Sequence, residues 1–132
     1  SSYFMWKVQI KHNRKTVAKG FYIEIYSLEE HIERFARLFD APGPGAGPVE
    51  IKQPFYSDGL FFVFRKEIFG FNQDLSEGLF EFYNCLLTAD ENRKVAPSDQ
   101  FFTLTNDAMK SSIKKAYNLL PNLKELLKKE FS

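Results

Sequence analysis

The residue types that most often carry catalysis are scarce in this chain of 132 residues, which has two histidines and one cysteine. His12 lies in a basic run, and a solvated turn explains this run better than a phosphate contact does. His31 lies beside the apolar stripe of a helix, between Glu30 and Glu33, and local salt links on the helix surface explain it best. No spacing of His, Cys or Asp is typical of a metal site. The histidines therefore predict neither a catalytic residue nor a metal ion.

Cys85 falls inside a helical pattern, and no neighbouring residue would lower the pKa of its thiol. A buried structural thiol is therefore a better interpretation than a nucleophile. A single cysteine forms no internal disulfide, which favours a reducing compartment. The first residues lack the charged and then apolar layout of a signal peptide, so a cytoplasmic location is expected. No apolar run approaches the ~18 residues of a membrane span, so no membrane partner is expected.

Two glycine-containing stretches could also present chemistry. Asp58-Gly59 could place a carboxylate at the edge of a pocket, but the pair is above all a turn signal. The run Ala41–Pro48 lacks the Lys-Ser/Thr of a phosphate-binding loop, and its prolines remove amide donors, so it is expected to be a surface loop. No motif commits the chain to an enzyme, and no cofactor is predicted. The alternative of a small enzyme whose site has no recognisable motif stays open.

Alternating apolar residues predict a sheet that would position any site. Residues 4–10 and 21–25 alternate and predict an opening hairpin, and Ser27–Asp40 has a capping box followed by helical spacing. Further strands are expected at 49–53, 60–65 and 101–105, and further helices start near Asp74 and Asn106. Pro121 is expected to kink the last helix, and residues 88–100 are expected to be a polar loop. The prediction is one α+β domain over 1–132, with about five antiparallel or mixed strands, helices on one face, and the order β-β-α-β-β-α-β-α.

The strand at 60–65 is the centre of this prediction. Phe61 and Val63 would point to one side, and Leu60, Phe62 and Phe64 to the other, so both faces need cover. The sheet face away from the helices would then carry an aromatic centre with a polar rim, which is the anatomy of a binding surface. The candidate binding residues are Lys7, Lys11, Tyr22, Tyr26, Phe61 and Phe64.

Three alternatives for what covers that face stay open. The C-terminal helix could cover it, another protein chain could cover it, or planar bases could stack on the aromatic residues while the lysines meet phosphate. The net charge of +1 gives no support to a nucleic-acid partner. An acidic middle segment beside a basic C-terminal segment favours self-complementary packing or a polar interface.

In outline the chain resembles the cap-binding translation initiation factor 4E family. The likeness covers most of the chain as an order of elements, and its residues are Trp6 in the opening hairpin, Tyr26-Ser27 before a helix, residues 55–60 before a strand, and the helix around 82–87. The resemblance implies a sheet-based fold that grips methylated guanine between two tryptophans beside a glutamate. This chain departs from that pattern, because Trp6 is its single tryptophan and Phe64, followed by Arg65, stands where the family has a stacking tryptophan.

The sequence thus favours a non-enzymatic binding module that acts by protein–protein contact through an aromatic sheet face. Its concrete forms are an inhibitor or immunity-type protein, or a homodimer. A nucleotide or single-stranded RNA binder is the alternative.

Overall fold

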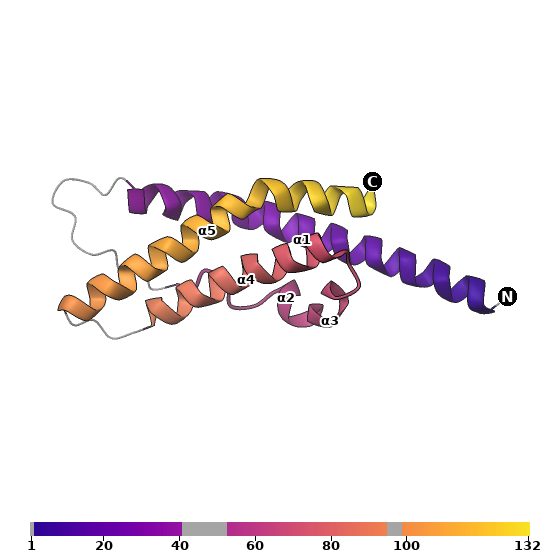
Figure 1. The fold of residues 1–132 in the computed structure, drawn as a ribbon, viewed down its shortest axis with the longest axis horizontal. Coiled ribbons are helices and arrows are strands. Elements are labelled where there is room, and N and C mark those ends of the chain that lie inside the picture. The colour runs from indigo at the N-terminus through magenta and orange to yellow at the C-terminus, as the bar shows by residue number, and fades with distance from the viewer. Residues whose placement is uncertain (1, 41–52, 95–98) are drawn as a thin grey trace.

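The computed structural model describes residues 2–40, 53–94 and 99–132, and within them the side chains of residues 13–39, 53–94 and 107–132. These parts of the chain contain helices and no strand. The elements are α1 (Ser2–Asp40), α2 (Leu60–Val63), α3 (Arg65–Ile68), α4 (Gln73–Arg93) and α5 (Asp99–Phe131). Three long helices therefore dominate the molecule, and α2 and α3 are single short turns between α1 and α4 (Figure 1).

The predicted α+β fold is therefore wrong, and α1 shows why. Phe21 and Ile25 are fully buried, whereas Ile23 between them is 59 % exposed. That is a spacing of four residues, which places side chains on one face of a helix, and a strand would have placed all three together. The buried positions of α1 continue at helical spacing: Ala18, Phe21, Ile25, Ile32, Ala36 and Phe39. The helix predicted over Ser27–Asp40 is confirmed, but it begins at Ser2 and absorbs the predicted hairpin.

The resemblance to the translation initiation factor 4E family is wrong for the same reason. The likeness depended on an opening hairpin and on a strand after residues 55–60. Those segments are α1 and α2, and no sheet exists in the described residues to carry a cap-binding site.

The central strand is also corrected. Residues 60–65 form α2 and the start of α3, and only Phe61 and Ile68 in these two helices are fully buried. Phe62 is 48 % exposed and Val63 is 68 % exposed. The segment thus buries one side and leaves the other open, so the need for cover on both faces does not arise.

Two further predictions fall partly within the described residues. The strand expected at 101–105 belongs to α5, and the polar loop expected at 88–100 begins with six residues of α4. The run Ala41–Pro48 lies outside the described residues, as does most of the strand expected at 49–53.

Helices α4 and α5 follow the apolar stripes of the sequence. The Asn72 side chain caps α4 by accepting a hydrogen bond from the Leu75 amide at 2.9 Å. The buried stripe of α4 includes Leu75, Leu79, Phe82, Tyr83 and Leu86, and that of α5 includes Met109, Ile113, Ala116, Leu120, Leu123 and Leu127. A Cβ at Gly78 would lie 2.8 Å from Leu123, so this glycine lets α5 approach α4 closely. Helix α5 runs on through Pro121.

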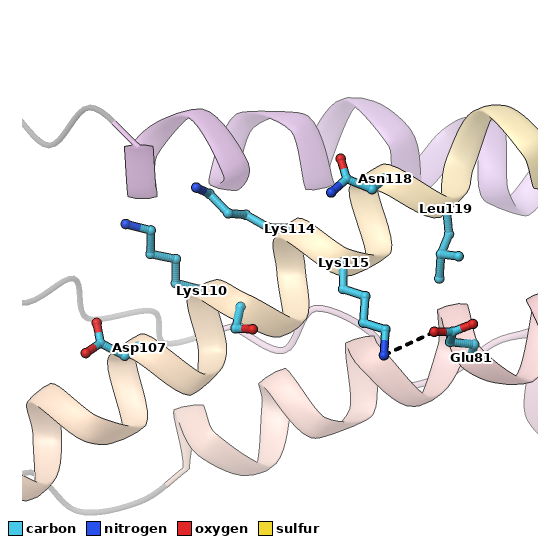
Figure 2. A pocket seen from close by; sticks show the side chains of 8 residues that line it. Glu81, Asp107, Lys110, Lys114, Lys115, Asn118 and Leu119 are labelled. Carbon is cyan, nitrogen blue, oxygen red and sulfur yellow. Dashed lines mark ion pairs between the residues drawn. The ribbon is translucent and has the colours of Figure 1, made fainter.

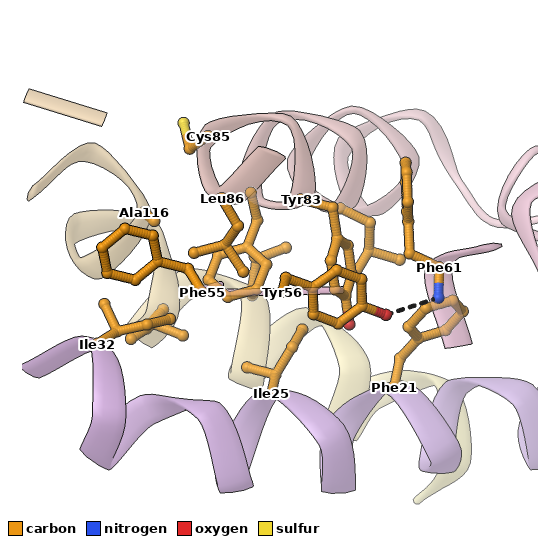
Figure 3. Close-up of a cluster of buried hydrophobic side chains, with 14 of the residues drawn as sticks. Phe21, Ile25, Ile32, Phe55, Tyr56, Phe61, Tyr83, Cys85, Leu86 and Ala116 are labelled. Carbon is orange, nitrogen blue, oxygen red and sulfur yellow. Dashed lines mark hydrogen bonds between the residues drawn. The ribbon is translucent and has the colours of Figure 1, made fainter. Parts of the chain in front are cut away.

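The core lies where the connection after α1 returns between the long helices. Helix α5 packs along both α1 and α4. Phe55 and Tyr56, which precede α2, lie between α1 and α4 and are about 95 % buried (Figure 3). Burying one large apolar side chain stabilises a fold by about 1.5–3 kcal/mol, so this connection is a structural part of the core.

Candidate functional site

The best candidate for a functional surface is a group of exposed apolar side chains on the connection from α1 to α4. Phe62 and Val63 lie on α2, and Phe69 follows α3; their exposed fractions are 48 %, 68 % and 72 %. We call these three residues the exposed apolar patch. Single exposed apolar residues are common on protein surfaces, but a group within eight positions of the sequence calls for a reason.

The first turn beneath this patch is held to α1 by the carboxylate of Glu24. Its Oε1 accepts hydrogen bonds from the hydroxyls of Tyr56 and Tyr83, both at 2.7 Å. Its Oε2 accepts from the backbone amide of Leu60, the first residue of α2, at 2.9 Å. The Tyr56 hydroxyl in turn accepts from the Phe61 amide at 3.1 Å. One carboxylate therefore joins α1, α2 and α4.

Both tyrosines of this network are held in their protonated form. Burial raises the pKa of the Tyr83 hydroxyl far above its usual value, and the negative charge of Glu24 raises it further. Burial and the hydrogen bond to Glu24 likewise raise the pKa of Tyr56. The phenols therefore act as permanent hydrogen-bond donors and carry no acid–base chemistry near neutral pH.

A second carboxylate holds the same connection to α4. Asp90 is 4 % exposed. Its two oxygens accept hydrogen bonds from the backbone amides of Phe55 at 2.6 Å and Tyr56 at 3.0 Å. The Arg93 Nε lies 3.3 Å from the Asp90 Oδ1, so the buried charge is also paired. Burying a charge is costly unless it is paired and hydrogen-bonded, and Asp90 meets both conditions.

Aromatic packing completes the platform. The Phe61 ring stacks on the Tyr83 ring, with centroids 4.8 Å apart and planes 22° apart. The Phe69 ring lies 5.0 Å from the Phe80 ring of α4, and the Arg65 guanidinium lies 5.3 Å from the centre of the Phe61 ring. The exposed apolar patch is thus fixed from below by hydrogen bonds and rings, which is a preorganised arrangement.

A hollow of about 300 Å³ adjoins the patch between α1 and α3. It is lined by Asn13, Arg14, Val17, Lys66, Glu67, Gly70 and Phe71. Arg14 is not free in this hollow, because its guanidinium binds both carboxylate oxygens of Glu130 at 2.9 Å. Lys66, Glu67 and Gly70, which line this hollow, are close in sequence to Phe69 of the patch.

Other hollows are more polar. One of about 480 Å³ lies along α5 and is lined by Lys110, Lys114 and Lys115 of α5 and by Glu81 of α4. Figure 2 shows Lys115 pointing toward Glu81, whereas Lys110 and Lys114 point away from α4. The Lys115 ammonium lies 3.1 Å from the Glu81 carboxylate, and this hydrogen bond raises the pKa of Lys115. A hydrogen-bonded lysine whose pKa is raised stays charged, so it is a poor general base.

The histidine and cysteine side chains that the structure describes do not form a reactive site. Burial raises the pKa of the Cys85 thiol, so the thiolate is disfavoured. Burial, together with the charge of Arg34, lowers the pKa of His31, and its ring packs against Phe35 at 4.8 Å. Among the described side chains no group of three His, Cys, Asp or Glu could hold a metal ion. None of the described helices is long and apolar enough to cross a membrane.

The six candidate binding residues predicted from the sequence lie in separate parts of the structure. Tyr22 and Tyr26 lie on the side of α1 that meets α5, with their rings stacked 6.3 Å apart. Phe61 is buried beneath the patch, and Phe64 is partly buried between α2 and α3. Lys7 and Lys11 belong to α1, but their side chains lie outside the described part. The sheet face that joined these six residues does not exist, and their role in binding stays a prediction.

Sequence reasoning missed Glu24, Asp90 and Phe69. From the sequence, Glu24 falls in the strand predicted at 21–25 and Asp90 in the loop predicted at 88–100. Their partners are backbone amides and hydroxyls far away in the sequence. Phe69 lies beyond the strand predicted at 60–65. The only available signal was the density of phenylalanine over residues 61–71, which exceeds what a single buried face can accommodate.

Comparisons of this chain with family models, with curated proteins and with solved structures gave no match.

Proposed function

We propose that this chain is a non-enzymatic binding module that acts by protein–protein contact, and that the exposed apolar patch is its contact surface. One observation carries the proposal. Phe62, Val63 and Phe69 are exposed on a connection whose residues Phe55, Tyr56 and Leu60 are bound by the carboxylates of Asp90 and Glu24. A rigid surface with an apolar centre loses little conformational entropy on binding, which favours association.

A second copy of the chain is the partner that fits best, because the charges around the patch are self-complementary. Arg65 and Lys66 carry positive charge, Asp58 and Glu67 carry negative charge, and all four residues are exposed. None of them lies within ion-pair distance of an opposite charge among the described residues. In a two-fold symmetric contact each patch faces its own copy, so both signs of charge find partners.

The test is the mass of the protein in solution as a function of its concentration. Analytical ultracentrifugation from micromolar to submillimolar concentration should show a reversible dimer of the unmodified chain. A contact confined to this small patch is expected to be weak. The double variant Val63→Ser with Phe69→Ser should stay monomeric, and circular dichroism should show unchanged helix content because both side chains are mostly exposed.

The matched control removes two exposed apolar side chains from α1. Ile23 and Leu38 are 59 % and 42 % exposed, so Ile23→Ser with Leu38→Ser should dimerise like the unmodified chain. A chain that stays monomeric at every concentration would overturn the proposal of self-association. Equal loss of dimer in both double variants would refute the assignment of the contact to the patch.

A further inference from the structure

A second surface lies on the other side of α1, where α1 meets the end of α5. The rings of Tyr22 and Tyr26 are one helical turn apart and stack at an interplanar angle of 27°. The Phe131 ring meets the Tyr22 ring edge-on at 5.4 Å, and the Lys128 ammonium lies 5.7 Å from the centre of the Tyr22 ring. Tyr26 is 64 % exposed. The surface therefore offers an open aromatic ring beside a cation.

The charge on the N-terminal side of these tyrosines is positive. Between Ser2 and Ile23, α1 contains Lys7, Lys11, Arg14, Lys15 and Lys19 and no acidic residue. Lys15, Lys19 and Lys128 are exposed. No carboxylate among the described residues lies within ion-pair distance of these three lysines.

One nearby carboxylate on each helix is paired, whereas Glu30 and Glu125 are exposed. Glu29 of α1 lies 2.5 Å from the Lys124 ammonium, and Glu130 of α5 binds Arg14. The lysines beside the tyrosine pair therefore keep their charge available for a partner. This local excess is hidden in the whole-chain balance, because the formal net charge is only +1.

We infer that Lys15, Lys19, Tyr22, Tyr26 and Lys128 form a binding surface for single-stranded nucleic acid. Stacking of bases on exposed aromatic rings and contact of lysines with phosphates are the two interactions by which proteins hold single strands without reading sequence. An acidic protein or an anionic membrane would use the lysines, but neither needs two parallel rings. In Figure 1, α1 runs past the rest of the molecule at its N-terminal end, so a strand could continue along the helix past Lys15.

The experiment is fluorescence anisotropy with a labelled uridine oligonucleotide about 20 nucleotides long, repeated over a series of salt concentrations. We expect binding at low salt that weakens as salt increases, because phosphate contacts release counterions. Tyr26→Ala should weaken binding about tenfold with little change in salt dependence, because it removes stacking and no charge. Lys19→Ser with Lys128→Ser should reduce the slope of log affinity against log salt by about 1.4, which corresponds to two phosphate contacts on a single strand.

The control is Val63→Ser with Phe69→Ser, which alters the exposed apolar patch and leaves this surface intact. It should bind the oligonucleotide like the unmodified chain, so a failure of the dimer proposal and a failure of this one can be distinguished. Absence of binding at low salt would overturn the inference. So would binding that Tyr26→Ala leaves unchanged, or retention on vesicles of anionic phospholipid without retention of the oligonucleotide.

Discussion

Replacing Glu24 by glutamine is the sharpest test of the network beneath the exposed apolar patch. The carboxylate accepts from Tyr56 and Tyr83 at one oxygen and from the Leu60 amide at the other. A glutamine amide has one oxygen and one nitrogen, and its nitrogen is a donor. With its oxygen toward the tyrosines, the glutamine places its amide nitrogen against the Leu60 amide, donor against donor. Turned the other way, the nitrogen can donate to the phenol oxygens, but both hydroxyls lose the carboxylate oxygen that accepts their protons.

The expected loss follows from these contacts. A hydrogen bond to a charged group contributes about 1.5–3 kcal/mol, and leaving a buried donor unpaired costs about 1–3 kcal/mol. Tyr83 is fully buried, but Leu60 is only partly buried, so water can replace part of the lost contact. We therefore expect Glu24→Gln to lower the free energy of unfolding by about 2–3 kcal/mol. A domain of this kind is stable by only about 5–15 kcal/mol in total, so the change is easy to detect.

The assay is urea denaturation followed by circular dichroism at neutral pH. The matched control is Glu30→Gln on the same helix, because Glu30 is exposed and should change stability by less than about 0.5 kcal/mol. A double-mutant cycle that combines Tyr83→Phe with Glu24→Gln, measured against the unmodified chain, should give a coupling energy of about 1 kcal/mol. Equal midpoints for Glu24→Gln and Glu30→Gln, at equal slopes, would refute the claim that Glu24 holds α2 to α1.

Two further outcomes follow from the same structure. Asp90→Asn should lower the free energy of unfolding by about 2–4 kcal/mol. In the unmodified chain the two carboxylate oxygens accept from the Phe55 and Tyr56 amides, and asparagine has only one oxygen to accept with. Urea denaturation measures the loss, and a loss below about 0.5 kcal/mol would contradict this prediction. The raised pKa values of Tyr56 and Tyr83 make stability depend on alkaline pH: their contribution is complete below the ordinary tyrosine pKa of 10.0 and is lost as pH rises above it. Thermal melts from neutral pH upward should therefore show destabilisation that begins above about pH 10 and is smaller in Tyr83→Phe. Identical pH profiles for Tyr83→Phe and the unmodified chain would contradict the raised pKa of Tyr83.

The candidate site could not be predicted from sequence for a definite reason. The residues that build it meet only in space: Glu24 lies 32 and 59 positions from the tyrosines it accepts from, and Asp90 lies 35 positions from Phe55. No spacing rule links a helix carboxylate to amides so far away in the chain. Tyr22 and Tyr26 were predicted to share a surface, and they do lie together, but four residues apart on a helix and not on the outer face of a sheet.

The sequence by itself determined the middle of α4 and most of α5, but not the end of α4 or the start of α5, which it assigned to a loop and a strand. The stripe of Leu75, Leu79 and Phe82, and that of Ile113, Leu120 and Leu127, repeat every three to four residues over many turns, and all of these residues are buried. Short segments are different. Phe21, Ile23 and Ile25 alternate as the residues of a strand do, whereas Phe21 and Ile25 taken alone also fit one face of a helix. Only tertiary packing decided between them, because α5 and the connection between α1 and α4 cover Phe21 and Ile25 and leave Ile23 in water.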